Sequence, residues 1–175
     1  MPLVRLRSLF LLAFVASLAI LGGTFYLELG LGLVPCPLCL SQRILLSLFA
    51  IVCLGALLQR PRLRGLCRYA AVALVCAVLG VLLAARHIWL QSASFVPEME
   101  CHPPLGYLVY TRSWSQVLEA MLLGSPDCVR ISWTFMDLSV PEWSLLAFMV
   151  LTLFTLTVTF VGLRIRMARR RMARL

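Results

Sequence analysis

The sequence predicts an all-α integral membrane protein with four transmembrane helices. Of its 175 residues, 62% are hydrophobic and 13% are charged, and the mean hydropathy is +0.96. Soluble domains have about 45–50% apolar and about 25% charged residues. Four apolar runs also approach the roughly 20 residues that a helix needs to cross the bilayer core. These observations exclude an ordinary soluble enzyme and a disordered chain.

Each predicted span is an almost uncharged apolar run. The first is preceded by Arg5 and Arg7 and resembles a signal peptide, but its length and the three later spans favour a retained helix. The second is interrupted only by Arg43. We expect residues 1–175 to form a single membrane domain. The four runs are Leu9–Leu27, Leu40–Leu58, Tyr69–Ala85 and Trp143–Leu163.

The arginines predict the orientation of these spans. The chain has sixteen basic residues, all Arg, and seven acids. Most of the Arg residues, with no acid among them, lie in the N-terminal tail, the loop after the second span and the C-terminal tail. Because basic short loops stay in the cytoplasm, both termini should be cytoplasmic. We interpret the basic C-terminal tail as a topology signal that contacts anionic lipid, and we expect no nucleic-acid binding.

The two outer loops then cover residues 28–39 and 86–142. The first is short and rich in Gly and Pro, which indicates a tight hairpin between the first two spans. In the second, apolar residues from Trp114 to Leu122 recur at helical spacing, which predicts a short amphipathic helix on the membrane surface. A helix packed only on the rest of its own loop is the alternative.

Cys36-Pro37-Leu38-Cys39 lies where the second span is expected to begin on the outer side. The positive end of a helix dipole favours a thiolate over a thiol. Pro37 suits the first helical turn, because its missing N–H would have no partner there. The two-residue spacing lets the sulfurs meet across one turn, on a side of the membrane where disulfides persist. These features predict a redox-active pair.

Other cysteine chemistry is less consistent with the pattern. The alternatives for the pair are a static disulfide or half of a zinc site, but zinc sites usually have a second close pair or added His, and the remaining cysteines are scattered. Covalent haem needs His after the second Cys, and residue 40 is Leu. We assign Cys53, Cys67 and Cys76 to packing.

Cys101 and Cys128 are both in the long outer loop and can come together. Alone they would be read as a structural disulfide that constrains the loop. Beside a second redox pair on the same face, we interpret them as a functional pair that an incoming thiolate can reach. A soluble thiol protein could then deliver electrons to the loop.

Arg43 shares a helical face with Cys36 and Cys39 and should lie about 6 Å deeper than Cys39. An intramembrane Arg is costly, so we expect it to stabilise a thiolate or the carbonyl oxygen of a membrane-soluble acceptor; snorkelling to the headgroups is the alternative.

His87, at the end of the third span, is either a proton donor to a reduced acceptor or an interfacial polar residue. No haem, flavin or dinucleotide motif is evident, which favours a lipid-soluble electron carrier.

This combination of motifs resembles the disulfide bond formation protein B (DsbB) family of bacterial inner membranes. The resemblance covers most of the chain. It rests on four spans with both ends inside, and on Cys36-Pro37-Leu38-Cys39 followed by Arg43, Ala85-Arg86-His87, single Cys101 and Cys128, Pro126-Asp127-Cys128, Trp133 and Pro141-Glu142-Trp143. It implies a four-helix bundle whose outer loops are periplasmic.

The resemblance further implies a quinone reductase that reoxidises the periplasmic thiol oxidase DsbA. Cys101 would form the mixed disulfide with DsbA, and Cys128 would then exchange with Cys36. Cys39 and Arg43 would contact the quinone, either ubiquinone or menaquinone, and His87 would line its pocket. The family pattern has an acid just before the matching Arg, whereas this chain has Gln42, so the resemblance offers no acid partner for Arg43.

Two other functions remain open from the residues alone. One is a related membrane thiol oxidoreductase dedicated to one substrate. The other is a small transporter or structural membrane protein whose cysteine pairs only staple loops. Transport usually places polar residues at mid-membrane, and here the spans carry mainly Ser, Gln and Thr besides Arg43.

Overall fold

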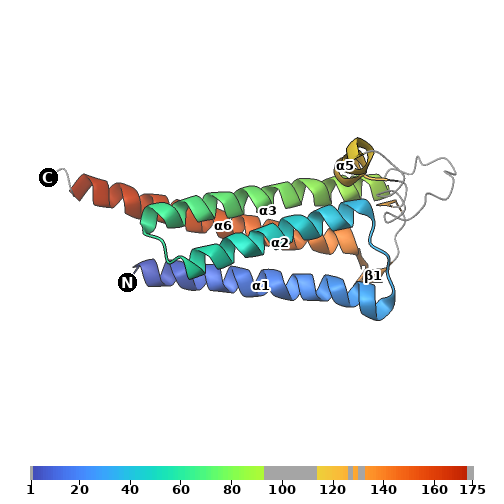
Figure 1. Ribbon diagram of the computed structural model, residues 1–175, viewed down its shortest axis with the longest axis horizontal. Coiled ribbons are helices and arrows are strands. Elements are labelled where there is room, and N and C mark those ends of the chain that lie inside the picture. Colours follow the sequence, from blue (N-terminus) through green and yellow to red (C-terminus); the bar gives the residue numbers. More distant parts are fainter. Residues whose placement is uncertain (1, 93–113, 126–127, 130–132, 173–175) are drawn as a thin grey trace.

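The structure is a computed structural model that describes residues 2–92, 114–125, 128–129 and 133–172. Four of its helices are long and apolar enough to cross a membrane, which confirms the predicted all-α class. These helices run side by side, with both termini at one end and α5 and β1 at the other (Figure 1). The elements are α1 (Pro2–Leu31), α2 (Pro37–Leu58), α3 (Leu63–Ser92), α5 (Trp114–Leu123), β1 (Thr134–Phe135), β2 (Leu138–Ser139) and α6 (Val140–Met172).

The helices extend beyond the apolar runs that predict them. α1 continues to Leu31, so Glu28 belongs to its last turn rather than to a loop, and α3 continues to Ser92, so His87 lies within the helix. A helix satisfies its own backbone hydrogen bonds, so it need not end where the apolar residues end. Both polar side chains are therefore held on rigid backbone.

Small residues let the helices approach one another closely. Along α3, Ala73, Ala77 and Ala84 are fully buried. At Gly80 a Cβ atom would lie 2.2 Å from the ring of Phe148 on α6, so only Gly fits there. Small residues at helix contacts are typical of membrane bundles, in which burial from lipid offers little driving force.

The outer faces of the bundle are apolar. Ile51, Val75 and Leu153 are all more than half exposed, at 62%, 58% and 64%. A soluble protein would cover such a surface, whereas lipid solvates it. Neighbouring helices pack in the order α1, α2, α3 and α6, and the contact between α1 and α6 is slight.

A β-hairpin leads into α6. Met136 and Asp137 both adopt positive φ in its two-residue turn, as type I′ turns require. The Ser139 N–H and hydroxyl both donate to the Glu142 carboxylate, at 2.6 and 2.8 Å. This is the reciprocal half of a capping box, and it fixes the start of α6. The Trp143 ring N–H donates to the Phe135 carbonyl at 3.1 Å and holds the hairpin on the helix.

The predicted short helix is present as α5, and it packs against the start of α2. Its Met121 carbonyl accepts a hydrogen bond from the Ser41 hydroxyl of α2 at 2.7 Å. α5 ends at Gly124, which adopts φ +95° and lies so close to Leu38 and Leu90 that a Cβ atom would clash. The end of α5 is thereby fixed against the start of α2 and the end of α3.

Candidate active site

The start of α2 brings the first two sulfurs together. Cys36 has extended backbone (φ −74°, ψ 165°) and is the N-cap residue, and Pro37 occupies the first helical turn as predicted. The Cys36 Sγ accepts a hydrogen bond from the Cys39 N–H at 3.4 Å and lies 3.2 Å from the Cys39 Sγ. The helix N-terminus thus directs unsatisfied N–H groups at the sulfurs.

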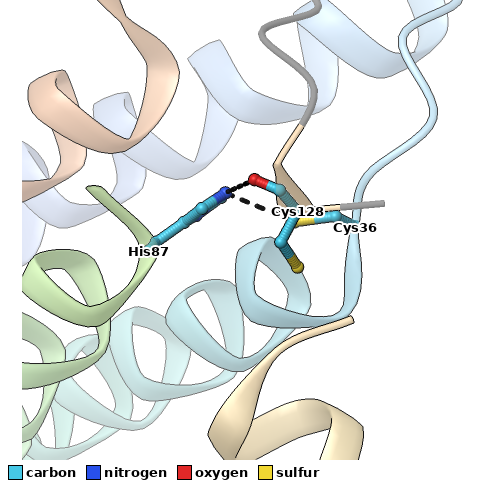
Figure 2. Close-up of side chains that lie close together, drawn as sticks. All are labelled: Cys36, His87 and Cys128. Carbon is cyan, nitrogen blue, oxygen red and sulfur yellow. Dashed lines mark hydrogen bonds between the residues drawn. The ribbon is translucent and has the colours of Figure 1, made fainter. Parts of the chain in front are cut away.

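A third sulfur comes from the long loop. Cys128 is buried beside Cys36 and His87, and the two Sγ atoms and a ring nitrogen all lie within 4.8 Å of one another. Figure 2 shows the His87 ring pointing from α3 toward both cysteines. Its Nε2 is 3.2 Å from the Cys128 carbonyl oxygen and 3.7 Å from the Cys36 Sγ. Three separate segments of the chain therefore meet at this point.

The surroundings of Cys128 raise the pKa of its thiol. Its contact with the Cys36 Sγ raises the pKa of the Cys128 thiol most, and burial raises it further. Its backbone is fixed by an N–H donated to the Ser125 carbonyl at 2.9 Å. Within the described residues, the cysteines are all free thiols. The structure therefore has a buried thiol in reach of a second sulfur.

Arg43 is held from α1. Its guanidinium pairs with the Glu28 carboxylate and donates to the Thr24 carbonyl oxygen at 2.9 Å. The Phe25 ring lies 5.3 Å from the guanidinium carbon. These contacts hold the charge of this α2 residue against α1 instead of allowing it to snorkel freely. Glu28 is thus the acid partner of Arg43, a role that Gln42, the residue before Arg43, cannot fill.

A pocket opens between α1, the start of α2 and the start of α6. The empty space between these elements, with its open mouth to solvent included, is about 740 Å³. Cys39, Gln42 and Arg43 supply its polar wall. The rest is mainly aliphatic and aromatic, and includes Ile20 and Phe148.

The residues predicted from the sequence fall into two groups. Cys36, Cys128 and His87 meet on one side of the start of α2, whereas Cys39 and Arg43 face the pocket on the other. His87 is not among the residues that line this pocket. Cys101 lies outside the described residues. Cys53 and Cys76 are buried in the apolar core, away from the site.

Two polar residues of the site were not singled out from the sequence. Glu28 could have been found by asking which acid neutralises a lone intramembrane Arg, because buried charges are normally paired. Gln42 is buried on the pocket wall, and its amide nitrogen has no hydrogen-bond partner among the described residues. Such an orphan donor indicates that something else accepts from it.

The sequence as a whole matches a known family model. Residues 6–158 match the model described as disulfide bond formation protein DsbB. The chain belongs to the DsbB family. It is 52% identical over 153 residues to disulfide bond formation protein B 2 of Pseudomonas putida, which covers 87% of this chain and 90% of the relative. It is 45% identical over 148 residues to disulfide bond formation protein B 1 of Pseudomonas aeruginosa, with 85% and 91% covered.

A more distant DsbB relative extends the same match. Disulfide bond formation protein B of Methylococcus capsulatus is 38% identical over 156 residues, covering 89% of this chain and 95% of the relative. Family membership gives this protein a DsbB-type role in disulfide bond formation, as a disulfide oxidoreductase. With four helices that can span a bilayer, it is a multi-pass membrane protein.

Proposed function

We propose that the protein reoxidises a periplasmic dithiol oxidase of the DsbA type and passes the electrons to membrane quinone, either ubiquinone or menaquinone. The enzyme would lie in the bacterial inner membrane with its active face periplasmic. One observation carries the proposal: Cys128 of the outer loop lies beside Cys36, while Cys39, one turn away, lines a pocket that opens between helices. The Cys36–Cys39 pair thus lies between a loop sulfur and an apolar cavity.

In this proposal the loop cysteines receive the electrons. A thiolate of the dithiol oxidase attacks Cys101 of a Cys101–Cys128 disulfide, forms a mixed disulfide and releases Cys128. Cys128 then attacks Cys36, which breaks a Cys36–Cys39 disulfide and frees the Cys39 thiolate. The partner's second thiol releases oxidised partner and frees Cys101, which attacks Cys128 and restores the loop disulfide. The two electrons now reside on Cys36 and Cys39.

The pocket wall suits a quinone. The Arg43 guanidinium and the unpartnered Gln42 amide offer donors to carbonyl oxygens, and the apolar wall suits a ring and an isoprenoid tail. A bound quinone would accept two electrons and two protons as the Cys36–Cys39 disulfide re-forms. Arg43 stabilises negative charge on the Cys39 sulfur and at the acceptor oxygen. Its contacts with Glu28 and Thr24 fix the position of the guanidinium for both roles.

His87 acts on the other side of the pair. Its contact with the Cys128 carbonyl oxygen helps to hold the loop sulfur near Cys36. Its ring also lies 3.7 Å from the Cys36 Sγ, where a proton can be exchanged as sulfur bonds form and break. The residue therefore serves the exchange between loop and pair.

Trapping of free thiols tests the proposal. The purified full-length protein is treated with a mass-adding thiol reagent before and after reduced DsbA-type partner is added, and again after quinone is added. With the partner in excess and no quinone present, a second round of exchange also reduces the loop disulfide. We therefore expect Cys36, Cys39, Cys101 and Cys128 to be labelled after the partner and protected again after quinone. If Cys36 and Cys39 stay reduced after quinone, the proposal is wrong.

A further inference from the structure

The group formed by Cys36, Cys128 and His87 also has the composition of a metal site. Each residue offers one ligand atom, and the three atoms lie within 4.8 Å of one another. The Cys39 Sγ, 3.2 Å from the Cys36 Sγ, becomes a fourth donor when its side chain turns from the pocket toward this group. Three thiolates and one imidazole form one of the usual ligand sets of structural zinc sites. The sequence suggested at most half of a zinc site at Cys36 and Cys39, because the other two ligands come from distant segments.

The distances from the Cys36 Sγ are close to those of a tetrahedral site. With Zn–S bonds of about 2.3 Å and Zn–N bonds of about 2.0–2.1 Å, tetrahedral ligands lie about 3.8 Å apart for two sulfurs and about 3.6 Å apart for sulfur and nitrogen. The Cys36 Sγ lies 3.7 Å from the His87 Nε2. The Cys36 and Cys39 sulfurs would need to separate by roughly half an ångström, within reach of a small χ1 rotation.

The local environment tolerates the charge and the ligation. Zinc with three thiolates carries a net charge of −1, and the N-terminus of α2 presents its positive dipole end at Cys36 and Cys39. The Nδ1 atom of His87 has no partner among the described residues, whereas the Cys128 carbonyl oxygen holds the ring proton on Nε2, so ligation through Nε2 moves this proton to Nδ1. Ligation would replace the contact between Nε2 and the Cys128 carbonyl with a bond to the metal.

We propose that the fully reduced protein binds one zinc ion through Cys36, Cys39, Cys128 and His87. Binding displaces the protons of the three thiols and involves no electron transfer. Forming either proposed disulfide removes ligands, so the oxidised protein does not hold the ion. Bound zinc occupies the sulfurs that must exchange, and it therefore inhibits thiol oxidation until a chelator removes it. Because binding is measured without quinone or partner protein, this proposal can fail while the proposed function stands.

Zinc affinity of the full-length protein in detergent tests the proposal. Reduced and oxidised samples compete for zinc with a chromophoric chelator under anaerobic conditions. We expect one ion per reduced chain and none per oxidised chain. Since loss of outer-shell partners alone weakens zinc sites by about 10–100-fold, His87→Ala and Cys128→Ser should each weaken binding by at least about 100-fold. Cys53→Ser and Cys76→Ser, which remove lone core cysteines, are matched controls and should bind as the unaltered chain does.

X-ray absorption of zinc in the unaltered protein provides a measurement that needs no variant. We expect three sulfur neighbours at about 2.3 Å and one nitrogen neighbour at about 2.0 Å. Coordination by sulfur alone, or by oxygen and nitrogen alone, would overturn the proposal. Unchanged affinity in His87→Ala would overturn it as well.

Discussion

At the scale of single residues, Arg43 carries the largest electrostatic cost of the site. An Arg within a span costs on the order of 2.5–3.5 kcal/mol by insertion scales. Its side chain is 15% exposed, and it faces a Glu28 side chain that is 34% exposed. The ion pair and the Thr24 carbonyl offset much of this cost and hold the guanidinium at the pocket wall. Its position therefore depends on α1 as well as on α2.

Replacing Arg43 separates the two halves of the proposed reaction. Arg43→Ala should slow quinone reduction by about 10²–10³-fold, the usual effect of removing one preorganised donor. Attack by the partner thiol should change little, since it occurs at the loop. Glu28→Gln keeps a polar partner for Arg43 but removes the carboxylate that neutralises its guanidinium. We therefore expect a smaller decrease in the rate of quinone reduction. Stopped-flow quinone absorbance and quenched thiol trapping measure the two steps.

Arg64→Ala is the matched control for this experiment. Arg64 is exposed near the start of α3, at the opposite end of the bundle from the pocket. Its loss should leave both steps unchanged. An equal slowing of both steps in Arg43→Ala would contradict the role assigned to Arg43.

Cys128 predicts a specific pH dependence. Because its pKa is raised chiefly by the contact with Cys36, less thiolate is present at neutral pH than for an ordinary Cys with a pKa near 8.5. Alkylation of Cys128 in the reduced, metal-free protein should therefore have its midpoint above about pH 8.5. In Cys36→Ala the midpoint should fall, leaving only the effect of burial. Mass spectrometry of samples alkylated across a pH series measures this, and an unchanged midpoint would contradict the contact.

At the scale of elements, the packing of α3 on α6 depends on Gly80. A Cβ atom at this position would lie 2.2 Å from the Phe148 ring, so Gly80→Ala must push the two helices apart. Overpacking of this kind costs about 1–3 kcal/mol, which exceeds the gain of about 1 kcal/mol in helix propensity. We expect a lower Tm in detergent.

Gly23→Ala is the matched control, because nothing lies within 4 Å of a Cβ atom there. It should leave the Tm unchanged or raise it slightly. Gly80→Ala combined with Phe148→Leu should recover part of the loss. A Tm for Gly80→Ala equal to that of Gly23→Ala would show that the helices do not meet as described.

The elements also show what could be predicted from the sequence. Pro37 predicted the start of α2, because its missing N–H makes it a reliable first-turn residue. Apolar periodicity predicted α5. The continuation of α1 through Glu28 was missed, because hydropathy marks the hydrocarbon edge and not the end of the helix. The meeting of His87 with Cys128 was missed too, because long loops lack the periodicity that would place their residues.

At the scale of the whole molecule, the charge distribution and the fold agree that both termini lie on the same side. Both termini lie at the same end of the bundle, opposite α5 and β1 (Figure 1). The Arg-rich segments gather at the end that holds the termini, as the positive-inside rule requires of cytoplasmic ends. The sequence could predict this arrangement because four spans must return the chain to the side where it began.

Reporter fusions test this orientation. Alkaline phosphatase, which is active only after export, should be active when fused at Gly32 and inactive when fused after Gln59 or Met172. Replacing Arg60 and Arg62 of the loop between α2 and α3, together with Arg64 and Arg68 at the start of α3, with Gln should raise the activity of the Gln59 fusion, because it weakens the signal that retains this end of the helices. High activity of the Met172 fusion in the unaltered chain would contradict the orientation.

The proposed function depends on one series of thiol–disulfide exchanges that joins the outer loop to the cysteine pair at the start of α2. Disulfide mapping in a Cys39→Ser, Cys101→Ser double variant tests it most directly, because Cys36 and Cys128 then lack their other proposed partners. After mild oxidation and non-reducing proteolysis, we predict a Cys36–Cys128 disulfide by mass spectrometry, as expected for sulfurs within 4.8 Å of each other. Recovery of both cysteines as free thiols, or of Cys128 joined to Cys53, would contradict the account.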